Sequence, residues 1–212
     1  AGFAARYGMP MADMLALDLP DSCNGASGRI VDGDKYLLFN DPLAGLLDFS
    51  LNGSESAGFA AAAQRLEPHR KNARFGCVFD TLYTLCRVLE LKADLGARTR
   101  KAYMSGDRAA VAALLPDYDE TQKRLEVFYD TFRTQWYREN KPQGFEVQDA
   151  RLGGLMLRLK NARRLLADYA GGAVERLEEL EEPVLPLFGA DNVGNGLCFN
   201  SWRQSFTAGA MF

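Results

Sequence analysis

The sequence predicts a mainly α protein: an antiparallel bundle of three long helices, with shorter flanking helices and an irregular C-terminal tail. Three observations support this fold class. Apolar residues recur at helical spacing over three long stretches, and helix-ending residues such as Gly171-Gly172 and Pro183 follow such stretches. No repeat with a period of about 33–50 residues is found, which disfavours a solenoid. The chain has 212 residues and is 47% hydrophobic, enough for a sizeable core.

The first third of the chain is expected to contain short elements. They are a helix over residues 1–18 that is interrupted at residues 8–10, a loop over 19–36 with an Asp32-Gly33 turn, a short buried strand or extended segment over 36–39, and a small alanine-rich helix over 54–66. The buried segment ends at Asn40-Asp41-Pro42, where Asp41 can cap a short helix that has Pro42 at its first position.

The remaining chain is dominated by the long helices. Their expected ranges are about 74–105, 117–140 and 146–170, with a short piece near 107–115, an acidic helix near 173–182 and an irregular tail from 184 onward. Pro116 stands where the start of the second helix tolerates a proline. The third helix has a 3-4-3-4-3 apolar seam typical of a bundle: Leu152, Leu155, Leu159, Ala162, Leu166 and Tyr169.

Composition and charge exclude several classes of function. The net charge of -3 and the pI near 5.3 disfavour nucleic acid as a partner. No apolar run approaches the ~20 residues that cross a bilayer, so no membrane association is expected. His69 is the single histidine and lacks the Glu-x-x-His spacing of bundle metal sites, and no glycine-rich phosphate loop occurs. We therefore expect no metal and no cofactor.

The acidic residues have structural interpretations. The adjacent pair Asp119-Glu120 falls in the first turn of a predicted helix, where the helix dipole explains negative charge better than catalysis does. The cluster at 178–182 is expected to be a solvated helix face.

The four cysteines, Cys23, Cys77, Cys86 and Cys198, form no C-x-x-C pair. Cys77 and Cys86 lie nine residues apart in one predicted helix, about 13 Å, which is too far for a disulfide. Buried free thiols in a reducing, cytoplasmic compartment are the favoured interpretation.

The stretch 136–158 is the most unusual, because it forms a helix–turn–helix hairpin with polar residues concentrated near the turn. Gly153 and Gly154 lie inside its second helix, where glycine costs up to about 1 kcal/mol relative to alanine and commonly permits close approach of another group. Two interpretations stay open. Polar residues can tie the turn together beside Trp136, or the hairpin can be a docking face or the rim of a pocket; the polar residues concerned are Asn140, Gln148, Asp149 and Arg151.

Several separated strings then agree in order with one family. They are residues 36–48 (YLLFNDPLAGLLD), 139–155 (ENKPQGFEVQDARLGGL), 178–184 (EELEEPV) and 200–203 (NSWR). This pattern resembles the helical C-terminal domain of bacterial exo-β-N-acetylhexosaminidases of glycoside hydrolase family 20. The resemblance covers about residues 36–204. It implies that residues 1–20 are a linker or the end of a preceding catalytic portion, and that residues 21–212 are the helical domain.

The resemblance implies a parent enzyme with a small α/β domain, a catalytic (β/α)₈ barrel and this helical domain. The resemblance implies that the parent enzyme hydrolyses its substrate by a substrate-assisted, retaining mechanism. In this mechanism an Asp orients the acetamido group of the substrate, and an adjacent Glu acts first as general acid and then as general base. The H-x-G-G-D-E motif that carries this pair is absent here, so no catalytic residue is carried over.

The expected role is that of a non-catalytic domain that packs on its own barrel and supports a homodimer. The N-acetylhexosaminide substrate is expected to be a partner only of the whole parent enzyme and not of this domain alone. Two alternatives remain: a carbohydrate-contacting module with Trp136 or Trp202 as a stacking platform, or an unrelated helical protein-interaction domain. The candidate interface or sugar-contacting residues are Trp136, Asn140, Asp149, Arg151 and Trp202.

Overall fold

The computed structural model describes residues 2–23 and 33–184, and within these ranges the regular structure is helical. The α-helices are α1 (Gly2–Tyr7), α2 (Met11–Met14), α3 (Leu19–Ser22), α4 (Gly33–Phe39), α5 (Glu55–Leu66), α6 (Gly76–Lys92), α7 (Leu95–Met104), α8 (Arg108–Glu139), α9 (Phe145–Ala170) and α10 (Glu178–Glu181). Short 3₁₀ helices occupy Leu15–Asp18, Asp48–Ser50 and Glu67–His69.

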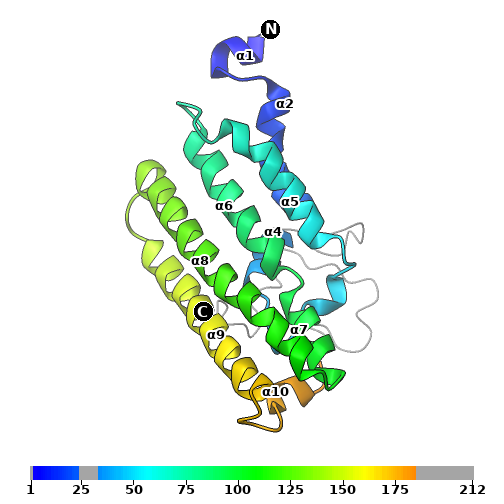
Figure 1. The fold of residues 1–212 in the computed structure, drawn as a ribbon. Coiled ribbons are helices and arrows are strands. Elements are labelled where there is room, and N and C mark those ends of the chain that lie inside the picture. The colour runs from blue at the N-terminus through cyan, green and yellow to red at the C-terminus, as the bar shows by residue number, and fades with distance from the viewer. Residues whose placement is uncertain (1, 24–32, 185–212) are drawn as a thin grey trace.

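The bundle consists of α5, α6, α8 and α9 lying side by side in that order (Figure 1). The three long helices α6, α8 and α9 alternate in direction, and α7 turns the chain at the end opposite the α8–α9 turn (Figure 1). The predicted fold class, an antiparallel bundle of three long helices with shorter flanking helices, is confirmed. No helix among the described residues has both the length and the apolar character needed to cross a bilayer.

The seam of α9 was predicted correctly. All six of its seam residues are buried in the core: Leu152, Leu155, Leu159, Ala162, Leu166 and Tyr169. They pack against α8, whose Leu125 and Phe128 are also buried. Because a 3-4 apolar spacing keeps one stripe of a helix facing its neighbour, this pattern is a dependable signal.

The expected helix over 74–105 is wrong, because two helices occupy this range. The chain breaks at Ala93-Asp94, between α6 and α7. Asp94 then binds Arg98 at the start of α7, with 2.9 Å between its carboxylate and Nε. The break redirects α7 so that Gly96 meets the backbone of Pro42, where an added Cβ would lie 3.0 Å from the carbonyl oxygen. Apolar spacing continues across the break, so periodicity alone could not locate it.

The expected start of a helix near residue 117 is also wrong. Helix α8 begins at Arg108, capped by Asp107, whose side chain accepts from the Ala110 amide, and it continues through Pro116. Proline normally ends a helix because it lacks an N–H and crowds the carbonyl four residues earlier. Here Pro116 and Ala112 are both exposed, so water can bind the freed carbonyl. Packing of the residues that follow holds the helix together.

Shorter elements differ from expectation in four places. Residues 36–39 belong to helix α4 instead of a strand or extended segment, and residues 19–22 and 33–35 of the predicted loop are helical. Residues 41–44 form a turn instead of a helix, and the acidic helix is only Glu178–Glu181. A short apolar run such as 36–39 carries no period that separates helix from strand. The break at residues 8–10, the helix predicted over 54–66 (observed as Glu55–Leu66) and the helix end at Gly171-Gly172 are confirmed. Asp32 and the tail from 185 lie outside the described residues.

Gly153 does not provide the close approach that its position suggested. A Cβ added there would meet no heavy atom of the described structure within 4 Å. Among the described residues, no close packing therefore accounts for the conformational cost of Gly153 in a helix.

Gly96 and Gly153 give opposite predictions for the effect of an alanine substitution on stability. Gly153→Ala should stabilise the chain by about 0.5–1 kcal/mol, because the helix interior favours alanine and the space is open. Gly96→Ala should destabilise it by about 1–3 kcal/mol, because the new methyl group collides with Pro42. Urea denaturation of the two variants beside the unsubstituted chain measures both effects. No loss of stability in Gly96→Ala would contradict the close packing of α7 on Pro42, and a loss in Gly153→Ala would contradict the open space beside Gly153.

Candidate functional site

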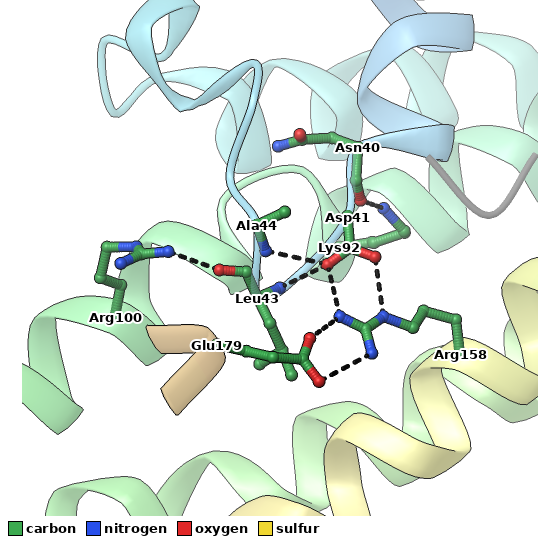
Figure 2. Close-up of polar contacts among 8 residues, drawn as sticks. All are labelled: Asn40, Asp41, Leu43, Ala44, Lys92, Arg100, Arg158 and Glu179. Atoms are coloured by element: carbon green, nitrogen blue, oxygen red, sulfur yellow. Dashed lines mark hydrogen bonds and ion pairs between the residues drawn. The ribbon is translucent and has the colours of Figure 1, made fainter. Parts of the chain in front are cut away.

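Residues 40–48, called here the buried connection, follow α4 and run through the interior of the fold without forming an α-helix. Asn40 and Asp41 are only 5% and 7% exposed, and Leu43 and Leu47 are fully buried. Backbone N–H and C=O groups that are buried outside regular structure need other hydrogen-bond partners. Two of its carbonyl groups, those of Asn40 and Leu43, accept hydrogen bonds from charged side chains on distant helices, and a third such side chain binds the Asp41 carboxylate (Figure 2).

Lys92 at the end of α6 provides the first of these partners. Its ammonium group is buried and donates to the carbonyl oxygens of Leu37, at 3.0 Å, and Asn40, at 2.8 Å. Burial lowers the pKa of Lys92 to about 8, against the opposing effect of Asp41 and Asp48. The lysine thus closes the end of α4 and fixes the start of the buried connection.

Arg158 of α9 provides the second partner. Its guanidinium holds both carboxylate oxygens of Asp41, at 2.7 and 3.1 Å, and also pairs with Glu179 of α10 (Figure 2). Asp41 accepts two further hydrogen bonds from the amides of Leu43 and Ala44, each at 2.9 Å. Burial alone would raise the pKa of Asp41, but these hydrogen bonds outweigh it and hold the pKa below its usual value.

The rest of the network completes the attachment. Arg100 of α7 donates to the carbonyl oxygens of Leu43 and of Leu180 on α10. Within the connection, the side-chain amide of Asn40 donates from Nδ2 to the Asp48 carboxylate at 2.9 Å. Burial nevertheless raises the pKa of Asp48. The buried connection is thereby joined to α6, α7, α9 and α10. The cations that contact the buried connection bind carbonyl groups and carboxylates of this chain itself. The arrangement therefore holds the helices together.

At the α8–α9 turn, three of the candidate residues have structural contacts. Trp136 donates from Nε1 to the Lys141 carbonyl at 3.0 Å, and its ring lies against Gly144, where an added Cβ would be 3.2 Å away. Asn140 ends α8 with its amide donating to the Trp136 carbonyl at 2.8 Å. Asp149 accepts from the Tyr129 hydroxyl at 2.7 Å. The side-chain contacts of Trp136 and Asp149 support the interpretation that these residues stabilise the hairpin, whereas the Asn140 contact is made by its backbone.

Arg151 has a different position, at a cavity of about 390 Å³ between α4, α6, α8 and α9. Gln148 lines the same cavity, and the Arg151 guanidinium lies 4.4 Å from the centroid of the Phe39 ring. Burial lowers the pKa of Arg151 to about 10. The structure thus separates Arg151 and Gln148 from the three residues of the turn. Trp202, the fifth candidate, lies outside the described residues.

The acidic residues considered for chemistry are engaged in ion pairs. Asp119 and Glu120 lie in the middle of α8, so the explanation from a helix first turn was wrong; Asp119 binds Arg163, and Glu120 binds Arg124. The cluster at 178–182 is also more than a solvated face, because Glu179 binds Arg158 and Glu181 binds Arg176. In residues 2–23 and 33–184, no group of three potential metal ligands comes together.

His69 and the cysteines complete this survey. The His69 ring is half-buried and packs 5.0 Å from the Phe79 ring, measured between centroids. Cys23, Cys77 and Cys86 are free thiols, with Cys86 buried and the other two partly exposed. Burial raises the pKa of the Cys86 thiol well above its usual range, so it stays protonated and unreactive at neutral pH.

Lys92, Arg100 and Arg158 were not singled out from the sequence. One signal was present: Lys92 continues the apolar face of Leu85 and Leu89 at helical spacing, so a charged residue occupies a position that faces the core. Such a lysine must either extend to solvent or find acceptors inside. Its acceptors lie about 50 residues away, and nothing in the local sequence indicates them.

The fold and the network define a class: a helical domain held together by internal ion pairs around a buried connection. The family model of the Glycoside Hydrolase 20C C-terminal domain matches residues 12–198, and the chain belongs to this family. No curated protein matches the chain significantly. The family match confirms the resemblance drawn from the sequence strings, and it removes the alternative of an unrelated helical interaction domain.

Substitution of two arginines of α9 tests how much the ion pair of the buried connection contributes to the free energy of unfolding. Arg158→Met should destabilise the chain by about 3 kcal/mol or more, because it leaves the Asp41 carboxylate buried without its cation. Arg163→Met is the matched control, since Arg163 also binds an aspartate through two nitrogens, but the two side chains are 36% and 45% exposed, against 21% and 8% for Arg158 and Asp41; its cost should be below about 1 kcal/mol. Urea denaturation measures both, and equal losses would contradict an anchoring role for Asp41.

Lys92 gives a prediction for pH dependence. Below about pH 8 the lysine is charged in both the folded and unfolded chain, and the cost of burying its charge is fully present. Between about pH 8 and the ordinary pKa of 10.5 the unfolded chain holds more protons, so the contribution of Lys92 to the free energy of unfolding rises with pH. Relative to Lys92→Met, the parent chain should gain up to about 3 kcal/mol between pH 7 and pH 10.5.

The comparison is made by urea denaturation of both proteins at each pH. Tyrosines and cysteines titrate in the same range, but they are present in both proteins and cancel in the difference. A difference that stays constant with pH would show that Lys92 is not buried as a charged group.

Proposed function

We propose that this chain is a non-catalytic accessory domain that packs on the catalytic barrel of a family 20 β-N-acetylhexosaminidase. Family membership supports the association with such a catalytic domain. The parent enzyme would remove terminal non-reducing N-acetylhexosamine residues by substrate-assisted retaining hydrolysis. The Asp-Glu pair for that reaction would come from the barrel, because the H-x-G-G-D-E motif is not in this chain.

The surface that we propose to contact the barrel is one end of the bundle, because three segments of the chain meet there. This hairpin end consists of α1, the turn between α5 and α6, and the α8–α9 turn (Figure 1). Arg74 in the middle segment donates to the Arg6 carbonyl at 3.2 Å, and Arg138 donates to the Arg74 carbonyl at 3.4 Å. The first residues of the chain are therefore attached to the hairpin end.

The hairpin end also exposes apolar surface. Tyr137 and Val147 are 46% and 43% exposed, and the rings of Phe3, Tyr7 and Phe75 are half-buried beside one another. If residues 1–20 lead from the catalytic portion, as the resemblance implies, the barrel lies next to this surface. Burial of the hairpin end against the barrel would remove these side chains from water. We propose this contact as the main interface, with homodimerisation as a further role of the same domain.

The sugar-contacting alternative has less support. A stacking platform needs an open aromatic face. The Trp136 ring instead packs on Gly144 and lies near the rings of Phe132 and Phe145, with centroid separations of 6.0 and 5.8 Å. We also propose a reducing, cytoplasmic location, which the free thiols support.

The test uses the full protein encoded by the reading frame that contains this chain. Tyr137→Arg and Val147→Arg should weaken the contact with the barrel, because a charge enters an apolar interface. In calorimetry, the barrel and helical domain should then unfold in separate transitions, where the parent enzyme shows one. Hydrolysis of a chromogenic N-acetylglucosaminide reports whether the barrel remains folded.

Leu157→Arg is the control. Leu157 is 68% exposed on α9 and lies ten residues from Val147, about 15 Å along the helix. This variant should leave a single transition. If all three variants behave like the parent enzyme, the hairpin end is not the interface. A reading frame without a barrel that carries H-x-G-G-D-E would overturn the proposed function itself.

A further inference from the structure

We propose that the hairpin end binds a carboxylate-bearing surface of the catalytic barrel through three exposed arginines, called here the arginine cluster: Arg6, Arg74 and Arg138. The inference rests on the proposed function, because it takes the barrel as the partner that covers the hairpin end. It adds the chemistry that the barrel must present at this contact.

The arginine cluster is assembled from three segments that are far apart in the sequence. Arg138, in the last turn of α8, donates from Nη2 to the Arg74 carbonyl at 3.4 Å, and Arg74 donates from Nη1 to the Arg6 carbonyl at 3.2 Å. The turn that carries Arg74 is held by Asn72, whose side-chain oxygen accepts from the amides of Arg74 and Phe75, each at 2.9 Å. The three arginines therefore form one patch at the hairpin end.

No carboxylate among the described residues forms an ion pair with the arginine cluster. Arg74 and Arg138 each donate one side-chain hydrogen bond to a carbonyl oxygen, and a guanidinium has further N–H groups that can bind an acceptor. The carboxylate that follows the cluster in sequence, Glu139, is bound instead to the side chains of Gln135 and Cys77. The positive charge of the cluster is thus not neutralised within the described fold.

The surroundings of the cluster are cationic as well. Apart from the Arg70–Asp80 ion pair, the segments of the hairpin end and the last turn of α8 carry more cations than carboxylates. The cations are Arg6, Lys71, Arg74, Arg138 and Lys141, and the carboxylates are Glu67 and Glu139. The whole chain, in contrast, has a net charge of -3. Cations that are gathered on one surface repel one another, and an anionic partner surface relieves this repulsion.

A protein surface is the anionic partner that fits the hairpin end best. The Arg74 guanidinium lies 5.2 Å from the centroid of the Tyr7 ring and 5.1 Å from that of Phe75. Tyr137 and Val147 are exposed at the same end. Arginine and aromatic residues together are enriched in protein–protein interfaces. Carboxylates of the barrel would pair with the arginines through parallel N–H groups, while the apolar side chains between them are buried.

The test uses the full protein encoded by the reading frame that contains this chain, and calorimetry follows its unfolding. Arg74→Glu and Arg138→Glu should each repel the carboxylates of the barrel. The helical domain should then unfold in a separate transition, at least about 4 °C below the single transition of the unsubstituted enzyme. Arg74→Lys keeps the charge but not the planar donor group, and should lower the transition less than Arg74→Glu. Hydrolysis of a chromogenic N-acetylglucosaminide reports whether the barrel remains folded.

Two controls separate docking from other effects of charge. Arg164→Glu makes the same change at an exposed arginine of α9 that forms no ion pair with the described residues, about 30 Å along the helix from the α8–α9 turn. It should leave a single transition. In the Tyr137→Arg variant, where the domains are expected to be separated already, the addition of Arg74→Glu should not lower the transition of the helical domain further. A further decrease would show that Arg74 stabilises the helical domain itself, and would overturn the inference.

The comparison with Tyr137→Arg distinguishes the failure of this inference from failure of the proposed interface. If Tyr137→Arg separates the transitions but Arg74→Glu and Arg138→Glu do not, the barrel docks through apolar contact alone; the inference is then wrong and the proposed function stands. If none of the three separates them, or if the unsubstituted enzyme already unfolds in two transitions, the hairpin end is not a stabilising interface and both fail.

Two further results would overturn the inference alone. Equal effects of Arg74→Glu and Arg164→Glu would indicate a non-specific effect of charge. Binding of single-stranded DNA by the unsubstituted enzyme, abolished in Arg74→Glu, would assign the arginine cluster to a nucleic acid instead of the barrel.

Discussion

The ion pair between Asp41 and Arg158 is the interaction on which the arrangement of this domain depends. It joins a buried, non-helical segment to the last long helix, and through Glu179 it also holds α10. Both carboxylate oxygens of Asp41 have donors inside the protein: Oδ1 accepts from two backbone amides and from Arg158 Nη2, and Oδ2 accepts from Arg158 Nε. Lys92 and Arg100 act in a similar way, since each donates to a carbonyl group of the buried, non-helical connection, which lacks the hydrogen-bond partners of a regular helix.

The bundle itself follows from simpler forces. A stripe of apolar residues on α9 and its counterpart on α8 bury hydrocarbon surface, and this much was predictable from the 3-4 spacing of residues such as Leu155 and Leu159. Helix boundaries were harder. Pro116 was expected to begin a helix but lies inside one, because the carbonyl that it frees faces water. The break before α7 could not be located from the apolar spacing, and the close contact of Gly96 with Pro42 that accompanies it joins residues about 50 positions apart.

The candidate sites divide in the same way. Sequence strings were sufficient to identify the family, because strings such as residues 36–48 and 139–155 combine many positions. Individual roles within those strings could not be assigned without the fold. Trp136 and Asp149 maintain the α8–α9 turn, whereas Arg151, two residues after Asp149, lines a cavity with α4. The neighbours that decide these roles come from other helices, and local sequence does not name them.

The distance in sequence between Asp41 and Arg158 has a consequence for how the domain is made. The two residues are 117 positions apart, so the partner of Asp41 is absent until α9 has been synthesised. Contacts between residues far apart in sequence tend to form late in folding. Closing the large loop costs conformational entropy before the contact contributes any favourable free energy. A nascent chain that stops before Arg158 would therefore contain Asp41 without the cation that it binds in the complete fold.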